Sequence, residues 1–266
     1  MNGYAFGLAP RKHYPSVPLW STLSANNVPA GAVAAAPAPV AHDWTAGMPK
    51  AGTPSDFGEM GNHNLNDCTC AAYYHARQVW TYVAAGTEIT ETDAVVATLY
   101  QEACNYNPAA GPPGPSAAAQ DVLTYIATKG APIAGGDGKQ RDFLTAFVEI
   151  DHTRYLDIKN AIFDCGIVFV GFPRPTNVTS DNPVWDYDRT APLTADGHAV
   201  VLAGYDDNGA IGISWGKRHT LTWDFIGAIV DEAYALVDKS WLDATQKTPA
   251  GLTLAQLQAA MKDLNG

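Results

Sequence analysis

Two side chains of this sequence, Cys68 and His198, have surroundings that suggest covalent chemistry. Cys68 closes the polar loop Gly61-Asn-His-Asn-Leu-Asn-Asp-Cys68 and starts an Ala-rich run with helical spacing. His198 opens an apolar run that ends in a Gly-Tyr turn at residue 205, which predicts a core strand. A thiol becomes nucleophilic when it loses its proton, and a helix N-terminus and a nearby imidazole both favour that loss. Acyl transfer through a cysteine is therefore the chemistry that these residue types indicate.

Each of the two residues also has a purely structural explanation. A lone cysteine is most often a small buried apolar residue. A histidine at the start of a strand is often a core residue with satisfied hydrogen bonds. Both explanations stay open for Cys68 and His198 taken singly, whereas the two contexts together favour the chemical interpretation.

Other partners for Cys68 within the same region are disfavoured by geometry. His75 follows Cys68 by seven residues, about 10 Å along a helix, which is too far for a hydrogen bond. A metal site built from His63, Asp67, Cys68 and Cys70 lacks the usual spacing of metal ligands. The sequence therefore predicts neither a metal nor another cofactor.

Hydrophobic periodicity predicts the elements that position these residues. Helices are expected over 67–84, with Asp67 as N-cap, over 90–104, capped by Thr90 or Thr92, from Ser116 as N-cap to Gly130, over 155–163 and over 222–237. Strands are expected over 143–150, 166–172, 198–205 and 210–215. Residues 173–196 are predicted to form a long loop that leads into His198. Since helices dominate the first half and strands the second, the predicted fold class is α+β.

Composition narrows the functional class. The chain has 266 residues, of which 47% are hydrophobic, and a net charge of −11 without any basic run, which argues against a nucleic-acid partner. No apolar stretch approaches the roughly 20 residues of a membrane span, so no membrane partner is expected. No secretory signal is recognisable, and four cysteines in a chain of this length are not a disulfide framework. We expect reduced thiols and a cytoplasmic location, or incorporation in a particle assembled there.

The first 50 residues differ in composition from the rest. They are rich in Pro, Ala and Gly and lack a sustained helical or strand period, so residues 1–50 are predicted to be an extended arm and residues 51–266 one domain. Such an arm buries little apolar surface by itself, so we expect it to lie across its own domain or a neighbouring subunit. A homo-oligomer or a particle assembled through this arm is therefore one expectation.

Several motifs together resemble the papain-like cysteine peptidase superfamily. They are the polar loop before Asp67-Cys68, the Gly166-Ile-Val-Phe-Val-Gly171 strand, the hairpin that starts at His198 and the Ser214-Trp-Gly216 strand. The hairpin is the most specific of them. Later segments, Thr222-Trp-Asp-Phe225 and Asp231-Glu-Ala-Tyr-Ala235, are similar to a poorly characterised bacterial and phage branch. The resemblance runs from about Met60 to Val237.

This resemblance implies a fold and a set of roles. The fold would have a helical left half and an antiparallel β right half around a cleft. Cys68 would be the nucleophile and His198 the general base and acid. Asn62, six residues before the cysteine, would donate a hydrogen bond to the oxyanion, with a shorter reach than the glutamine of the family.

One position departs from the family pattern. Ile213 stands where the family has the asparagine that orients the imidazole, so a Cys–His dyad is expected in place of a triad. Ser214 would replace it only if the strand register shifts by one residue. Two functions follow as alternatives: a cysteine peptidase or related amide hydrolase that acts on a peptide or protein substrate, or a non-catalytic structural protein of a phage particle or similar assembly.

Overall fold

The computed structural model of the chain describes residues 7–11, 17, 19–20, 38–52, 55–135 and 139–245. Within these ranges the helices are α2 (Cys68–Ala85), α3 (Asp93–Cys104), α4 (Ala119–Lys129), α5 (Tyr155–Cys165), α6 (Trp223–Ile229) and α7 (Lys239–Thr245), with short 3-10 helices η1 (Pro49–Ala51) and η2 (Pro108–Ala110). No helix in this part of the chain has the length and apolar character that a membrane crossing requires.

The strands form one large sheet and one small one. The large sheet has the order β4 (Leu144–Glu149), β10 (Glu232–Asp238), β5 (Val168–Pro175), β7 (Leu193–Tyr205), β8 (Gly209–Ser214), β9 (Lys217–Thr222) and β6 (Val184–Trp185), and β1 (His42–Asp43) also pairs with β7. All of these pairings are antiparallel except that of β6 with β9. The small sheet pairs β2 (Ala131–Pro132) with β3 (Arg141–Asp142).

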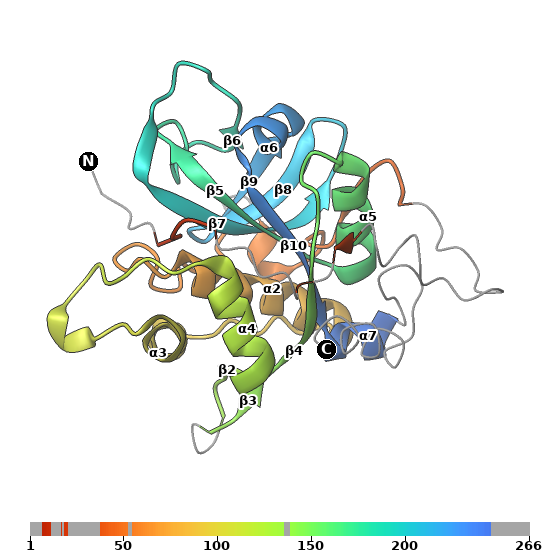
Figure 1. The fold of residues 1–266 in the computed structure, drawn as a ribbon. Coiled ribbons are helices and arrows are strands. Elements are labelled where there is room, and N and C mark those ends of the chain that lie inside the picture. The colour runs from red at the N-terminus through yellow and green to blue at the C-terminus, as the bar shows by residue number, and fades with distance from the viewer. Residues whose placement is uncertain are drawn as a thin grey trace.

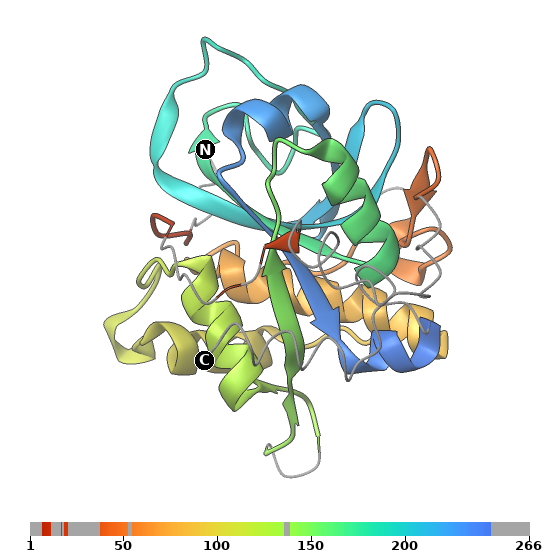
Figure 2. The ribbon, with the colours of Figure 1, turned by 45° about the vertical axis from the view of Figure 1, so that its right-hand side comes forward.

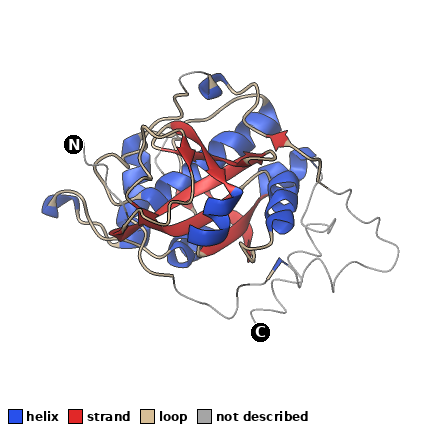
Figure 3. Cartoon of the chain, turned by 90° about the horizontal axis from the view of Figure 1, so that it is seen from above, coloured by secondary structure: helices blue, strands red, loops and turns tan. Residues whose placement is uncertain are grey.

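Helices and sheet occupy two halves of the molecule. Helices α2, α3 and α4 lie on one side, and the curved sheet of β5, β7, β8 and β9 lies on the other (Figure 1). Strands β4 and β10 run from the sheet down past the helices and join the two halves (Figure 2). Seen from above, helices flank the strands on several sides (Figure 3). Every residue of α2 from Cys68 to Trp80 is buried, as expected of a central helix that is enclosed on all faces.

Most predicted elements of the first half are confirmed, and one helix start is wrong. The helices predicted from residues 67, 90 and 155 correspond to α2, α3 and α5, and Thr92 caps α3 by accepting a hydrogen bond from the Val95 amide. Asp67 precedes α2 but makes no side-chain cap hydrogen bond. Ser116 was expected to cap the next helix, yet α4 begins at Ala119. Ala117 stays extended because its backbone bonds to Gly7 and Ala9.

The predicted helix over 222–237 is wrong in its second half. Thr222 caps α6, which ends at Ile229, and Val230 is extended. Residues Glu232–Asp238 then form β10 between β4 and β5, where all seven are buried. A strand buried on both faces shows no alternation, so periodicity does not distinguish it from a helix. Within the predicted loop 173–196, β5 extends to Pro175, β6 forms and β7 starts at Leu193.

Part of the predicted arm packs on the folded body. His42 and Asp43 pair with Tyr205 and Gly204 of β7, and the indole of Trp44 donates a 2.8 Å hydrogen bond to the Ile162 carbonyl. Residues 38–50 therefore lie across the same chain, as expected of an arm that cannot order itself. Residues 28–37, which belong to the same prediction, lie outside the described residues.

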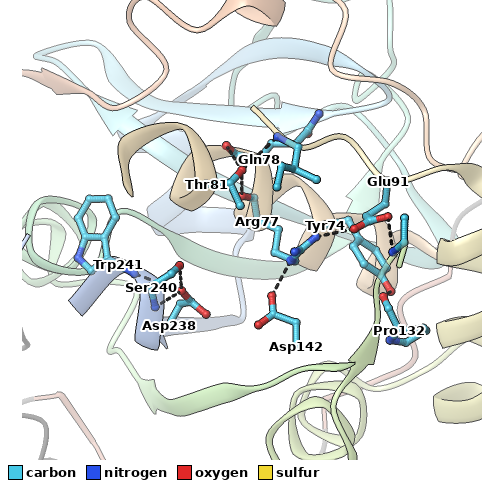
Figure 4. Close-up of polar contacts among 12 residues, drawn as sticks. Tyr74, Arg77, Gln78, Thr81, Glu91, Pro132, Asp142, Asp238, Ser240 and Trp241 are labelled. Atoms are coloured by element: carbon cyan, nitrogen blue, oxygen red, sulfur yellow. Dashed lines mark hydrogen bonds and ion pairs between the residues drawn. The ribbon is translucent and has the colours of Figure 1, made fainter. Parts of the chain in front are cut away.

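A buried ion-pair group links α2 to the segment before α3 and to β3 (Figure 4). Arg77 donates from Nη1 to Glu91 at 2.6 Å and from Nε to Asp142 at 2.5 Å. Glu91 also accepts a 3.0 Å hydrogen bond from the Ala134 amide. The side chains of Arg77 and Glu91 are 9% and 2% exposed, so neither charge has water as an alternative partner.

Replacement of Arg77 by alanine is expected to lower the free energy of unfolding by about 3–5 kcal/mol, because the variant leaves the Glu91 charge buried without its partner. Urea unfolding measures this loss. Asp181→Ala is the matched control: it removes the Lys217–Asp181 pair, in which the aspartate is 90% exposed, and about 0–1 kcal/mol is expected. Equal losses in the two variants would contradict a buried, unscreened pair at Arg77.

His75 gives the fold an acid-sensitive position. It is 1% exposed, its Nδ1 lies 2.8 Å from Gln78 Oε1, and burial lowers its pKa to about 4. The unfolded chain therefore binds a proton that the folded chain excludes between pH 6.5 and 4. The stability contribution is complete above pH 6.5 and is lost as the pH falls, by about 3 kcal/mol at pH 4. Urea unfolding at pH 7 and at pH 4.5 measures this effect. The free energy of unfolding should fall less on acidification for His75→Asn than for wild type, because asparagine keeps a donor for Gln78 and does not titrate. Equal losses in the two proteins would assign the acid sensitivity to other groups.

Candidate active site

Cys68 is the first residue of α2 and lies where the helical half meets the sheet. The loop before it turns sharply, with Met60 and Gly61 at φ 54° and 84°. A side chain at Gly61 would meet the Asp67 carboxylate at 2.8 Å, so the glycine allows this loop to close over the start of the helix. Burial raises the pKa of Asp67 well above its usual value, which favours a neutral acid beside Cys68.

The Cys68 thiol is buried, and burial favours its protonated form. Its exposure is 1%, and burial raises its pKa to about 12. The nearby backbone of Gly7 and of Ala199 opposes this rise in pKa. Since Ala199 follows His198 on β7, the structure places Cys68 against the strand segment that carries the candidate base.

His198 is held from two sides. Its Nε2 lies 2.8 Å from the Ser214 hydroxyl, and its ring stacks on Trp215 with centroids 4.2 Å apart and an angle of 10° between the planes. Trp215 and Gly216 have φ 47° and 72° and form the two-residue turn between β8 and β9, which lays the indole flat on the imidazole. Burial lowers the pKa of His198 well below 6.5, with further lowering by the charges of Arg174 and His219.

The side chain that contacts the His198 imidazole from β8 is Ser214, not Ile213. Ile213 is fully buried and pairs with Val201 of β7. Strands β7 and β8 shift register between Leu202 and Gly204. The side chain that reaches the imidazole is therefore that of Ser214 and not the neighbouring Ile213. The expectation of a histidine without a side-chain partner is therefore corrected: Ser214 supplies one.

Asn62 lies in the loop before α2 and is 2% exposed. Its Nδ2 donates a 3.3 Å hydrogen bond to the Leu65 carbonyl, and the nearby Asn62 amide lowers the pKa of the Asp67 carboxyl against the larger effect of burial. In this state the amide thus supports the loop that ends at Cys68. Its role as an oxyanion donor stays a prediction.

The alternative site residues have other partners. His63 pairs with Glu59 at 3.1 Å, and the Cys70 sulfur lies 3.9 Å from that of Cys104 in the core. Among the described residues, no group of three or more His, Cys, Asp or Glu side chains could hold a metal ion. The four cysteines are free thiols.

A segment near the N-terminus, residues 7–9, lies across the junction of the two halves, where its red trace is visible (Figures 1 and 2). The Leu8 amide donates to the Gly197 carbonyl of β7 at 3.4 Å. On the other side, Ala117 donates to the Gly7 carbonyl at 2.7 Å and accepts from the Ala9 amide at 2.9 Å. The segment therefore joins both halves through isolated β-bridges at Leu8, and the Gly7 backbone lies close to the Cys68 sulfur.

Gly7 is required for this approach. A methyl group at residue 7 would lie 1.5 Å from the carbonyl oxygen of Asn66, two residues before Cys68. Sequence reasoning missed this segment and gave Ser214 only a conditional role. A Gly in a low-complexity arm carries no local signal of the surface it will touch, whereas the Ser-Trp-Gly motif did mark the turn beside His198.

No protein-family model matches the chain, and no curated protein does. Among solved structures, xylellain, a cysteine protease from Xylella fastidiosa, is similar with a TM-score of 0.63 and 13% identity over 88% of this chain and 96% of that one. Procathepsin B S9 from Trypanosoma congolense gives 0.60 and 10% identity over 88% and 87%. Procathepsin L2 from Tenebrio molitor gives 0.59 and 16% identity over 88% and 78%. These likenesses confirm the predicted papain-like α+β fold.

Proposed function

We propose that this chain is a cysteine peptidase or related amide hydrolase, with Cys68 as nucleophile and His198 as general base and acid. The observation that carries the proposal is the closeness of Cys68 to the backbone of Ala199, which follows His198 on β7, together with the hydrogen bond between Ser214 and the imidazole. A helix N-terminus, a thiol and an oriented imidazole are the parts that acyl transfer needs.

The reaction would use these groups in order. The Nε2 atom of His198 lies 2.8 Å from the Ser214 hydroxyl, and in the tautomer that donates Nε2–H to this oxygen, Nδ1 is the basic nitrogen. The imidazole takes the thiol proton as the sulfur forms a bond to the substrate carbonyl carbon. The imidazolium then gives that proton to the leaving amine as the C–N bond breaks, and water, activated by the same imidazole, hydrolyses the thioester. Backbone N–H groups at the sulfur and the Asn62 amide are the candidate donors to the oxyanion.

The alternative is a non-catalytic protein of a phage particle or similar assembly, in the cytoplasm or in the particle itself. The observation that favours it is the state of the pair: burial raises the pKa of Cys68 to about 12 and lowers that of His198, so both groups are neutral. If the chain is a peptidase, Cys68 and His198 are neutral because the segment of residues 7–9 lies against the sulfur, and they ionise when it leaves. If the chain is a structural protein, both groups stay neutral in the assembled particle.

Mass spectrometry of the acyl-enzyme distinguishes the two functions. Incubation of the protein with a peptide thioester or nitrophenyl ester is expected to add the acyl group to Cys68 and then release it, and Cys68→Ala should form no adduct. Cys165, which is also buried, serves as an internal control within the same digest. Absence of an adduct at Cys68, even after displacement of the segment, would leave the assembly function.

A further inference from the structure

The thiols of Cys70 and Cys104 form a pair that is separate from the candidate dyad. Their sulfur atoms lie 3.9 Å apart, between the first turn of α2 and the last residue of α3. Residues two apart on a helix do not share a face, so Cys70 is directed at α3 while Cys68 lies against β7. The pair therefore joins two helices at a point close to the candidate nucleophile without including it.

The two thiols differ in exposure. Cys104 is 8% exposed, the largest value among the four cysteines, whereas Cys70 is 0% exposed. Cys104 ends α3, and Asn105 follows in the left-handed region at φ 58°, so the helix does not continue over it. Burial raises the pKa of Cys70 well above its usual value, so this residue stays a thiol until its neighbour has reacted. A small oxidant is therefore expected to react first at Cys104.

The end of α3 also supports the loop before α2. Tyr100 of α3 donates a 2.5 Å hydrogen bond to the Pro115 carbonyl. The adjacent Gly114 carbonyl accepts a 2.8 Å hydrogen bond from the side chain of Asn66, in the loop that leads into α2. A covalent bond from α3 to Cys70 would close these contacts into a ring around the start of α2, where the candidate nucleophile lies.

We propose that Cys70 and Cys104 are a redox modification site, at which a hydroperoxide joins α2 to α3 by a disulfide that holds the start of α2. The Cys104 sulfur bonds to one oxygen of hydrogen peroxide, the O–O bond breaks, and a sulfenic acid and one water form. The Cys70 sulfur then bonds to the sulfenic sulfur, the S–O bond breaks, and the oxygen leaves with the thiol proton as a second water. The sulfurs must approach by about 2 Å, a distance that side-chain rotation provides.

Mass spectrometry after peroxide treatment tests this site in the full-length protein and does not depend on hydrolase activity. Trypsin cuts after Arg77, so Cys104 lies on a different peptide from Cys70. Cys68→Ala protein is compared with wild type, because it leaves Cys70 as the one thiol of the tryptic peptide 51–77. Both proteins should lose about 2 Da, form the Cys70–Cys104 link at least about tenfold above any other pairing, and regain both thiols with dithiothreitol.

Variants assign the two roles. Cys104→Ser is expected to abolish the link, and Cys70→Ala should leave a sulfenic acid at Cys104 that dimedone captures. Cys165→Ala is the matched control and should form the link with the yield of wild type. A link in wild type that uses Cys68 or Cys165, or oxidation of Cys104 to sulfinic acid without any link, would overturn the proposal.

Hydrogen exchange measures the effect on the start of α2. The amides of Cys70 and Ala71 donate to the Asp67 carbonyl at 2.8 and 2.9 Å. Their exchange should slow by at least about fivefold in the oxidised protein, because the disulfide opposes local opening of this turn. The amides of α5 serve as the internal control and should not change. Disulfide formation with unchanged exchange at Cys70 and Ala71 would contradict the proposed hold on the start of α2.

Discussion

Full-length protein with Gly7→Ala is expected to react with iodoacetamide at Cys68 about 10²-fold faster than wild type at pH 7. The new methyl group cannot occupy a point 1.5 Å from the Asn66 carbonyl oxygen, so the segment of residues 7–9 must leave. Water then reaches the sulfur, and the burial that raises the pKa of Cys68 to about 12 is reduced. A thiol of that pKa is about 10⁻⁵ ionised at pH 7, whereas a free cysteine is about 3% ionised.

Two controls separate displacement of the segment from general loosening. Gly111→Ala makes the same substitution at a glycine with φ 77° and nothing within 4 Å of the added methyl group, and it should leave Cys68 protected. Cys165 is buried at the C-terminal end of α5, so its labelling should not change in Gly7→Ala. If all four cysteines label faster together, the variant has lost its fold and the segment is not a specific cover.

The sequence was sufficient to predict the central elements of the fold. Cys68 at the start of a helix, His198 on a core strand and the return strand at Ser214 all follow from local periodicity and turn residues. The same reasoning wrongly predicted a helix over 222–237. Residues 232–238 instead form a strand that lies between β4 and β5 and is buried on both faces, so its sequence shows no alternation of apolar and polar residues. Tertiary pairing, which a single sequence does not display, decides such a segment.

The parts of the site that escaped prediction depend on contacts between distant residues. Ser214 rather than Ile213 reaches the imidazole because β7 and β8 change register near Gly204, and a shift of this kind moves a side chain to the other face. Likewise, Gly7 is 61 residues from Cys68 in the sequence and meets it only because β7 and Ala117 offer free backbone groups on both sides.

His198→Gln, made in the Gly7→Ala protein, is expected to lower the rate of acyl transfer to Cys68 by about 10²–10⁴-fold. Glutamine keeps a polar side chain at this buried position but cannot accept the thiol proton at neutral pH. The measurement is the single-turnover rate of adduct formation with a peptide thioester, followed by mass spectrometry. Iodoacetamide labelling at pH 9.5 provides the control. Hydroxide then deprotonates the thiol without help from His198, so the labelling rates of the Gly7→Ala protein with and without His198→Gln should differ much less. A rate for His198→Gln within a factor of two of its parent would exclude His198 as the base.

The partner of His198 sets a final and finer test. Ser214→Ala in the same Gly7→Ala protein should lower the rate of acyl transfer by about tenfold, because the hydrogen bond at Nε2 holds the orientation of the ring. Ser214→Asn offers an amide acceptor in place of the hydroxyl and should recover part of the rate. Ile213→Asn, by contrast, buries an amide among apolar neighbours, costs about 1–3 kcal/mol of stability and brings no increase in rate. A rise in rate with Ile213→Asn would return the orienting position to residue 213 and contradict the register of β7 and β8.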